Sequence, residues 1–315
     1  MSTHIVTGVA GFIGSHLAET LLKQGVEVIG VDCLSDYYDP QLKLDNLAHL
    51  KDYSNFKFIK ADIQELDWGE LLTSVDVVYH LAAQAGVRSS WGKGFSNYTE
   101  QNINATQVIL EAAKQVKSLK RIVYASSSSI YGNAVTMPTP ETLCPQPVSP
   151  YGITKLAGER LCWLYQQNFD VPVTALRYFT VYGPRQRPDM AFHKFFKAAI
   201  AHEAISIYGD GQQTRDYTFV KDIVAANLAA AKVPEAIGEV FNIGGGSRVT
   251  LVELLDLMEQ VTGSIKREHL SNAVGDARHT SADIAKAQKI LGYTPRISLL
   301  EGLTQEWYWI KDLYV

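Results

Sequence analysis

The chain has 315 residues, of which 46% are hydrophobic and 20% charged, so it can bury a substantial core and lacks the composition of a disordered chain. Lys and Arg number 29 against 33 Asp and Glu, and the net charge of −4 excludes the basic excess that binding to nucleic acid or to an anionic membrane normally requires. We therefore expect a folded protein of about two domains whose partners are small molecules.

The N-terminus and the cysteines indicate where the protein resides. The chain begins M-S-T-H-I-V-T-G, without the basic residues and apolar run of a secretory signal, and no segment approaches the ~18 apolar residues that cross a bilayer. Cys33, Cys144 and Cys162 lie far apart, unlike the cysteines of disulfide frameworks and zinc sites, and the eight histidines do not cluster at ligand spacing. We predict a cytoplasmic protein that contacts no membrane and binds no metal.

Up to about residue 180, short β-branched apolar runs alternate with longer stretches of helical periodicity, which predicts a parallel sheet with helices on both faces. The predicted strands are His4–Thr7, Val26–Val31, Phe56–Ile59, Val75–His80, Arg121–Ala125 and Val173–Arg177. Two predicted helices are long, at Asn97–Lys117 and Pro150–Asn168. Pairing of these helices with those of a second copy would give a homodimer.

After Thr180 the alternation becomes irregular, and it resumes at Tyr217–Phe241, which is predicted to form a strand, a helix and a strand that rejoin the sheet. The predicted fold class is therefore α/β, a Rossmann-type doubly wound parallel sheet with a smaller, discontinuous α/β domain. We place the Rossmann domain at residues 1–179 and 217–247, and the smaller domain at 180–216 and 248–315.

A glycine-rich turn, Thr7–Gly14, follows the first predicted strand and begins the first helix. Gly8, Gly11 and Gly14 allow a tight turn and a close approach of the backbone to a pyrophosphate, which the N–H groups at the helix N-terminus would bind. Asp32 ends the second strand, where a carboxylate accepts the ribose hydroxyls and repels a 2′-phosphate, so NAD is favoured over NADP. The alternative interpretation is that these glycines serve packing alone.

Ligands of open α/β sheets bind at the carboxyl ends of the strands, where Asp62 and His80–Ala83 are predicted to lie. The other residues expected at the cofactor are Phe12, Ile13, Ile63, Leu81, Ala82, Ala83, Asn102, Tyr151, Lys155 and Tyr178. We therefore predict an NAD site along this edge of the sheet.

Tyr151 and Lys155 are four residues apart at the start of a predicted helix, so their side chains project from one face. An adjacent ammonium group and a nicotinamide cation both favour the phenolate form of a tyrosine, which can then act as a base. The run Ser126–Ser129 ends the fifth strand, so its hydroxyls are expected in the same crevice. An exposed helix pair and a polar loop are the alternative interpretations.

The combination of these motifs resembles the extended short-chain dehydrogenase/reductase family that modifies nucleotide sugars, over essentially the whole chain. The motifs are G-V-A-G-F-I-G, Asp32, H-L-A-A, S-S-S-S-I-Y-G, Y-G-I-T-K and L-R-Y-F-T-V-Y-G-P. Within that family, the segments Leu34–Pro40, His80–Arg88 and Phe179–Phe192 are most similar to UDP-glucuronate 4-epimerases.

The resemblance implies an isomerase that converts UDP-glucuronate to UDP-galacturonate through a transient 4-keto sugar, with a retained NAD and no net redox change. It implies that Tyr151 removes the O4 proton and that Ser127 hydrogen-bonds O4. Ser128 and Ser129 are found where related dehydratases have Asp and Glu, and the Glu of related decarboxylases is missing from this segment. Dehydration and decarboxylation are therefore disfavoured.

A 4-keto glucuronate is a β-keto acid, so its carboxylate must be held in an orientation that prevents loss of CO2. Ser128 and the backbone N–H of Thr180 are expected to hold it, and Thr180 replaces the Asn that is common in galactose-type epimerases. The residues expected to bind the substrate are Arg88, Ser127, Ser128, Ser129, Thr180, Arg187, Arg215 and Arg278. The alternatives are the same chemistry on UDP-glucose or UDP-N-acetylglucosamine, UDP-glucuronate decarboxylation, and an NAD-binding scaffold or redox sensor.

Overall fold

The computed structural model describes residues 2–270 and 278–315, and its centre is a parallel sheet of seven strands in the order β10-β6-β5-β4-β1-β2-β3. The strands are β1 (Thr3–Thr7), β2 (Glu27–Asp32), β3 (Phe56–Lys60), β4 (Val77–His80), β5 (Arg121–Ser127), β6 (Val173–Tyr178) and β10 (Val240–Ile243). The strand order reverses between β1 and β4, and such a switch point is where open α/β sheets form their ligand crevice.

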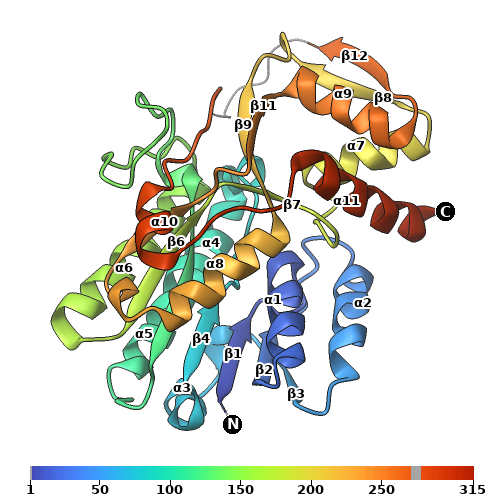
Figure 1. The fold of residues 1–315 in the computed structure, drawn as a ribbon. Coiled ribbons are helices and arrows are strands. Elements are labelled where there is room, and N and C mark those ends of the chain that lie inside the picture. Colours follow the sequence, from blue (N-terminus) through green and yellow to red (C-terminus); the bar gives the residue numbers. More distant parts are fainter. Residues whose placement is uncertain (1, 271–277) are drawn as a thin grey trace.

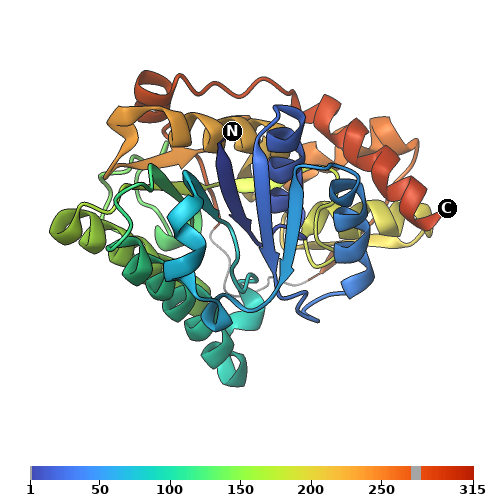
Figure 2. The same cartoon turned by 90° about the horizontal axis from the view of Figure 1, so that it is seen from below.

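Helices cover both faces of this sheet (Figure 1), because β-branched strands such as β4 are buried on both sides. One face is covered by α1 (Phe12–Lys23), α2 (Pro40–Lys51) and α8 (Val220–Lys232). The other is covered by α3 (Trp68–Leu71), α5 (Ala105–Ala113) and α6 (Pro150–Phe169). Figure 2 shows α8 (orange) and the pair α5 and α6 (green) on opposite sides of the sheet. These layers confirm the predicted Rossmann-type fold class.

A smaller part of the molecule lies beyond the carboxyl ends of the central strands (Figure 1). It contains a sheet of β7 (Thr180–Tyr182), β9 (Thr214–Phe219) and β11 (Ser247–Thr250), and a parallel pair of β8 (Ala204–Tyr208) and β12 (Lys266–Leu270). Its helices are α7 (Ala191–Ile200), α9 (Leu251–Thr262) and α11 (Leu299–Tyr314), and α10 (Ala285–Leu291) packs near β10. Over the described ranges, no helix is both long enough and apolar enough to cross a membrane.

Two predicted elements differ from the structure. The single helix predicted at Asn97–Lys117 is instead α4 (Phe95–Thr99), a π-helical segment Glu100–Asn104 and α5, and the wider π turn holds the buried Asn102. The strand, helix and strand at Tyr217–Phe241 were expected to rejoin the central sheet together. Only β10 does so, because β9 pairs with β7 and β11 instead. The division into two domains at the bounds given above remains a prediction.

Candidate active site

The turn between β1 and α1 is shaped by backbone contacts that leave no room for side chains. Gly8 has a φ of +68°, and a Cβ on it would lie 2.9 Å from Ala82 Cα. A Cβ on Gly14 would lie 2.2 Å from the carbonyl oxygen of Gly8. Gly11 is the N-cap of α1, whose start has no side-chain cap and no acidic residue in its first turn. The turn therefore fits the pyrophosphate of a dinucleotide, which needs a close backbone and free N–H groups.

Asp32 lies beside this turn at the end of β2. Its Oδ2 accepts a hydrogen bond from Ala10 N at 3.0 Å, and its Oδ1 accepts one from Leu34 N at 2.8 Å. Burial raises the pKa of Asp32, and these two amides and the charge of Lys43 oppose that shift. Each carboxylate oxygen keeps a second lone pair, so the side chain can also accept the hydroxyls of a ribose.

The loop after β4 packs against the glycine turn through Thr7. Its Oγ1 accepts hydrogen bonds from the N–H groups of Leu81 and Ala82, both at 3.1 Å, which fixes the Leu81–Ala83 segment beside Gly8. Phe12 and Ile13 lie in the first turn of α1. The structure thus brings the predicted segments after β1, β2 and β4 together at one edge of the sheet.

At the end of β3, the predicted residues Asp62 and Ile63 begin a short 3-10 turn. Asp62 caps this turn through Gln64 N, and its Oδ2 accepts a hydrogen bond from Gln101 Nε2 at 2.8 Å. Ile63 is buried against Trp68 and belongs to the core of the α3 face. Asp62 is therefore tied to the π-helical segment, whereas the side chain of Ile63 serves packing.

Asn102 and Tyr178, predicted at the cofactor, use their side chains inside the protein. Asn102 Nδ2 donates to Gln84 O at 3.0 Å and to Thr154 Oγ1 at 2.9 Å, and its Oδ1 accepts from Gln84 N at 2.8 Å. Tyr178 Oη donates to Asn227 Oδ1 at 2.8 Å. The Asn102 side chain therefore joins the loop after β4 to α6, a role that its place in the sequence did not indicate.

Ser127 and Tyr151 meet where β5 ends and α6 begins. Ser149 accepts a hydrogen bond from Gly152 N at 3.1 Å and so starts α6 one residue before Tyr151. A Cβ on Gly152 would lie 2.6 Å from the carbonyl oxygen of Ser129, so the helix start packs directly on the serine run. The Ser127 hydroxyl lies close enough to Tyr151 to lower the pKa of the phenol. The structure therefore brings the predicted pair together at the junction of β5 and α6.

Burial shifts the pKa values of Tyr151 and Lys155 in opposite directions. Burial raises the pKa of Tyr151, while the hydrogen bond with Ser127 and the charge of Arg187 oppose the shift. Burial also lowers the pKa of Lys155, to about 8, and its Nζ lies 4.6 Å from the centre of the Tyr124 ring. The Lys155 amine therefore packs over a buried ring one turn along α6, and its action on the phenol and the cofactor ribose remains a prediction.

Arg187 was predicted at the substrate, but its neighbours were not. Its guanidinium makes two hydrogen bonds to the carboxylate of Asp189, at 2.9 and 3.0 Å. The ring of Tyr98 packs edge-on against Tyr151, with centroids 6.3 Å apart. Tyr37 Oη donates to Asp189 Oδ2 at 3.4 Å. Tyr37, Tyr98 and Asp189 could not be predicted, since no spacing rule connects them, although Tyr37 and Asp189 lie in segments that carry the family resemblance.

Ser128 and Thr180 differ in exposure from the residues before them. Ser126 and Ser127 are buried, and Ser126 Oγ donates to Glu159 Oε2 at 2.6 Å. Ser128 starts a short 3-10 turn and Thr180 starts β7, and both are only half-buried. Their hydroxyls therefore remain accessible at the carboxyl ends of β5 and β6.

The other predicted arginines lie around the smaller part of the molecule. The guanidinium of Arg88, from the loop after β4, lies 5.7 Å from the centre of the Tyr208 ring at the end of β8. Arg215 Nη1 donates to the carbonyl of Arg278 at 3.0 Å, and Arg278 pairs with Asp210 at 2.6 Å on the surface. The structure thus brings Arg215 and Arg278 together, and Arg88 bridges to the smaller part.

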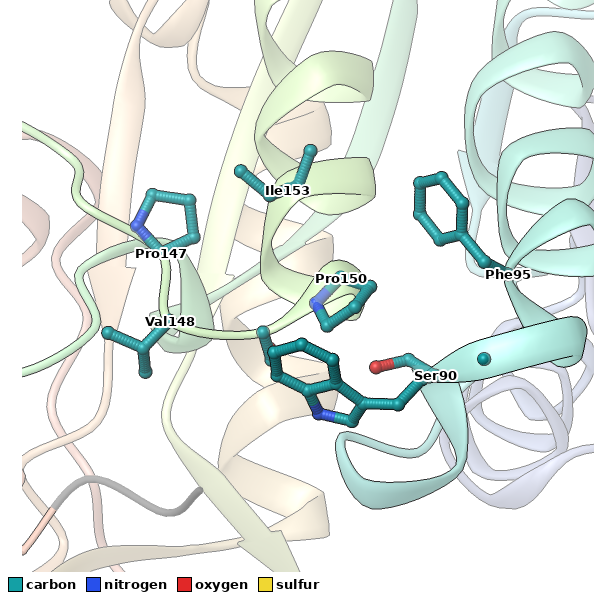
Figure 3. A pocket seen from close by; sticks show the side chains of 9 residues that line it. Ser90, Phe95, Pro147, Val148, Pro150 and Ile153 are labelled. Carbon is teal, nitrogen blue, oxygen red and sulfur yellow. The ribbon is translucent and has the colours of Figure 1, made fainter. Parts of the chain in front are cut away.

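A pocket of about 580 Å³ opens between the starts of α4 and α6 (Figure 3). It is lined by residues 90–92, Phe95, residues 147–150 and Ile153. Ser127, Tyr151 and Lys155 do not line it, so the pocket is separate from the candidate active site.

Comparison with known proteins agrees with this geometry. The model of the NAD dependent epimerase/dehydratase family matches residues 4–244. The chain is 39% identical over 318 residues to UDP-glucuronate 4-epimerase of Thermodesulfobacterium geofontis (strain OPF15), covering 99% of this chain and 97% of that protein. It is 46% identical over 315 residues to an uncharacterized UDP-glucose epimerase of Bacillus subtilis (strain 168), covering 98% of each.

A solved structure is similar over the full length. The crystal structure of UDP-glucuronic acid 4-epimerase from Bacillus cereus, in complex with UDP-glucuronic acid and NAD, matches with a TM-score of 0.94 and 46% identity. The match covers 99% of this chain and 100% of that chain.

Proposed function

The chain belongs to the NAD-dependent epimerase/dehydratase family, and we propose on that basis that it is an isomerase that inverts C4 of UDP-glucuronate to give UDP-galacturonate. The proposal is supported chiefly by the meeting of Ser127 and Tyr151 at the carboxyl edge of a sheet whose glycine turn fits NAD. It is also supported by neutral hydroxyl groups, in place of an acid and a base, at Ser128 and Ser129.

The residues that would hold NAD are those of the glycine turn, Asp32 and the Leu81–Ala83 segment. When bound, NAD supplies a reversible two-electron oxidation of the sugar at C4. Tyr151 removes the O4 proton and later returns it, while Ser127 hydrogen-bonds both groups and so holds O4 in line with the phenol. Lys155, with a pKa lowered to about 8 by burial, is positioned one helical turn away to bind the cofactor ribose.

The oxidised substrate is a β-keto acid, which loses CO2 when its carboxylate lies perpendicular to the ketone plane. Ser128 and the backbone N–H of Thr180 hold the carboxylate away from that orientation. The half-buried positions of Ser128 and Thr180 at neighbouring strand ends support this role. The 4-keto sugar therefore persists long enough to turn over in the site and be reduced on its other face.

The rest of the nucleotide sugar needs cationic partners. The guanidinium groups of Arg88, Arg215 and Arg278 are our candidates for the diphosphate, because a planar guanidinium pairs well with phosphate oxygens. The proximity of Arg215 to Arg278 and of Arg88 to Tyr208 supports one binding region between the two parts of the chain. Ser129 and Arg187 complete the proposed substrate set.

The function is tested by mixing purified protein with UDP-glucuronate and no added NAD. UDP-galacturonate should form, and anion-exchange chromatography separates it from the substrate. UDP-xylose as the product would indicate decarboxylation, and turnover of UDP-glucose or UDP-N-acetylglucosamine alone would reassign the substrate. Absence of turnover with all of them would favour an NAD-binding scaffold or redox sensor.

The Tyr151→Phe variant tests the chemistry directly. Because it removes only the proton carrier, we expect loss of turnover with NAD still bound. Undiminished activity would remove Tyr151 from the mechanism.

The Ser128→Ala variant tests the carboxylate site. It should weaken UDP-glucuronate binding selectively, or release UDP-xylose as a by-product. Equal losses on every UDP-sugar would contradict the proposed role.

We further propose a cytoplasmic homodimer formed through α4 and α6. Ile153 and Leu164 lie about three turns apart on one face of α6 and are 48% and 46% exposed, and the pocket of Figure 3 adds Trp91 and Phe95 to the same apolar surface. Light scattering should give a dimer for the wild type and a monomer for Ile153→Glu with Leu164→Glu. Val135→Glu, on an exposed loop, is the control. A monomeric wild type would refute the proposal.

A further inference from the structure

A buried histidine lies between the cofactor segment and α5. His80 ends β4, directly before Leu81–Ala83, and is 2% exposed. Its Nδ1 lies 2.9 Å from Thr7 Oγ1 in β1, and its Nε2 lies 3.1 Å from Thr106 Oγ1 in α5. Thr7 and Thr106 are buried as well. Each ring nitrogen therefore has one hydroxyl partner in a region from which solvent is excluded.

The hydrogen bonds of Thr7 decide whether Nδ1 of the ring carries a proton. A threonine hydroxyl has one hydrogen and two lone pairs. The N–H groups of Leu81 and Ala82, both at 3.1 Å, occupy the two lone pairs of Thr7 Oγ1. The Thr7 hydroxyl must therefore donate its hydrogen to His80 Nδ1, which carries no proton.

The hydrogen bonds of Thr106 decide the state of the other ring nitrogen. Thr106 Oγ1 donates its hydrogen to the carbonyl of Asn102 at 2.8 Å, so toward His80 it can only accept, and Nε2 carries the ring proton. The opposite tautomer and the doubly protonated ring both place a proton on Nδ1, facing the Thr7 hydrogen. Burial and the charge of Lys155 lower the pKa of His80 to about 3, in agreement with a neutral ring.

The hydrogen bonds continue from α5 to the helix that carries Tyr151. Asn102 lies in the π-helical segment, and its Nδ2 donates to Thr154 Oγ1 in α6 at 2.9 Å. Thr154 Oγ1 in turn donates to the carbonyl of Tyr151 at 2.9 Å. Asn102 and Thr154 are both buried. One buried chain of hydrogen bonds, with every donor and acceptor assigned, thus connects the cofactor segment to the backbone of Tyr151.

The place of the cofactor segment matters because it packs on the glycine turn. A Cβ on Gly8 would lie 2.9 Å from both Cα and N of Ala82, so a shift of the segment changes the turn that fits the pyrophosphate. We propose that His80, as the Nε2–H tautomer, is a positioning residue that couples the Leu81–Ala83 segment to the helix carrying Tyr151. The inference rests on the proposed cofactor site and not on the identity of the sugar.

Thr106→Val tests this coupling at a residue of α5 that precedes neither the glycine turn nor Tyr151. The change removes the acceptor of the ring proton and nearly preserves the shape of the side chain. The Nε2 proton is then unsatisfied unless it moves to Nδ1, where it opposes the Thr7 hydrogen and displaces the amides of Leu81 and Ala82. We expect NAD affinity to fall about tenfold, within the effect of one unsatisfied buried donor.

Two further variants separate positioning from packing. Thr106→Ser restores the acceptor and should restore NAD affinity. Thr218→Val is the matched control, because Thr218 is a buried threonine of β9 whose hydroxyl has no hydrogen-bond partner among the described residues. It should leave NAD affinity unchanged. Isothermal titration of the emptied proteins with NAD measures all of these affinities without turnover.

The tautomer is measured directly by long-range proton–nitrogen NMR correlation, which distinguishes a bare ring nitrogen from a protonated one. The His80 signals are those that both Thr7→Ser and Thr106→Ser perturb. We expect a bare Nδ1 and a protonated Nε2 in the wild type at neutral pH. A proton on Nδ1 would overturn the inference, whether or not Thr106→Val folds.

The packing interpretation gives a different result in the same experiments. If the chain of hydrogen bonds served only stability, Thr106→Val would lower the urea midpoint and leave NAD affinity unchanged, and this outcome would also overturn the positioning role. If the wild type bound NAD but turned over no UDP-sugar, the proposed function would fail instead. The affinities and the ring signals would still decide the role of His80.

Discussion

Gly14→Ala tests whether the glycine turn holds the cofactor. In the first turn of α1, a Cβ at position 14 would lie 2.2 Å from the Gly8 carbonyl oxygen and 3.1 Å from Val9 Cα. Both are backbone atoms, so they cannot rotate away as the end of a side chain could. A Cβ atom in a folded protein hardly ever lies closer than 3.0 Å to another heavy atom, and this one would lie at 2.2 Å. To remove the difference, α1 must move away from the turn by about 0.8 Å. The N–H groups at the start of α1 move with it.

The size of the effect follows from this displacement. Forcing one extra methyl group into a closely packed site costs about 1–3 kcal/mol. At about 1.4 kcal/mol per tenfold change in affinity, NAD binding should weaken roughly tenfold to a hundredfold. A cofactor that copurifies with the wild type should then be largely lost from the variant.

The assay is the amount of NAD released per chain when protein purified without added cofactor is denatured. Isothermal titration of the emptied proteins with NAD gives the affinities. Gly69→Ala, in α3, is the control, because a Cβ there would meet only a side-chain oxygen of Asp67 at 3.3 Å. Circular dichroism shows whether the variant is folded. A folded Gly14→Ala protein that retains NAD within threefold of the wild-type affinity would refute the reasoning.

Two further predictions concern the stability of the fold. Glu159→Ala leaves the buried Arg177 guanidinium without its bidentate partner, so urea denaturation should show a loss of about 3–5 kcal/mol, and a loss below about 1 kcal/mol would contradict this. Burial lowers the pKa of His16 to about 4 and that of His80 to about 3. Both rings stay neutral in the folded protein, whereas they take up protons below about pH 6.5 in the unfolded chain. The free energy of unfolding should therefore be highest above pH 6.5 and fall as the pH drops toward 4. An unchanged urea midpoint between pH 7.5 and 5 would disprove this.

Much of the fold could be predicted because its signals are local. The alternation of β-branched runs and helical stretches depends only on residues that are close along the chain, so it predicts a parallel sheet without knowledge of distant contacts. The prediction failed where nonlocal pairing decides. Nothing within Thr214–Phe219 indicates that its partner strands are β7 and β11 and not a strand of the central sheet. The π-helical turn at Glu100–Asn104 was also missed, because its wider spacing leaves no simple period in the sequence.

The same distinction between local and nonlocal signals holds for the candidate site. The places of Gly8, Gly14 and Asp32 could be predicted because strand ends and turn chemistry fix them, and those of Ser127 and Tyr151 because each follows a recognisable element. Spacing did not decide where the Lys155 amine lies. Lys155 is the neighbour of Tyr151 along α6, and only the packed structure shows its amine over the Tyr124 ring.

The sequence by itself determined the kinds of elements, the glycine turn and the chemical groups available for catalysis, because these depend on residues close along the chain. Only the tertiary structure decided which loops meet, and so joined Tyr37 to Asp189 and Asp189 to Arg187. Electrostatic effects on a buried group depend on distance in space and on the exclusion of water. Both are properties of the packed molecule, and residues more than a hundred positions apart can set them.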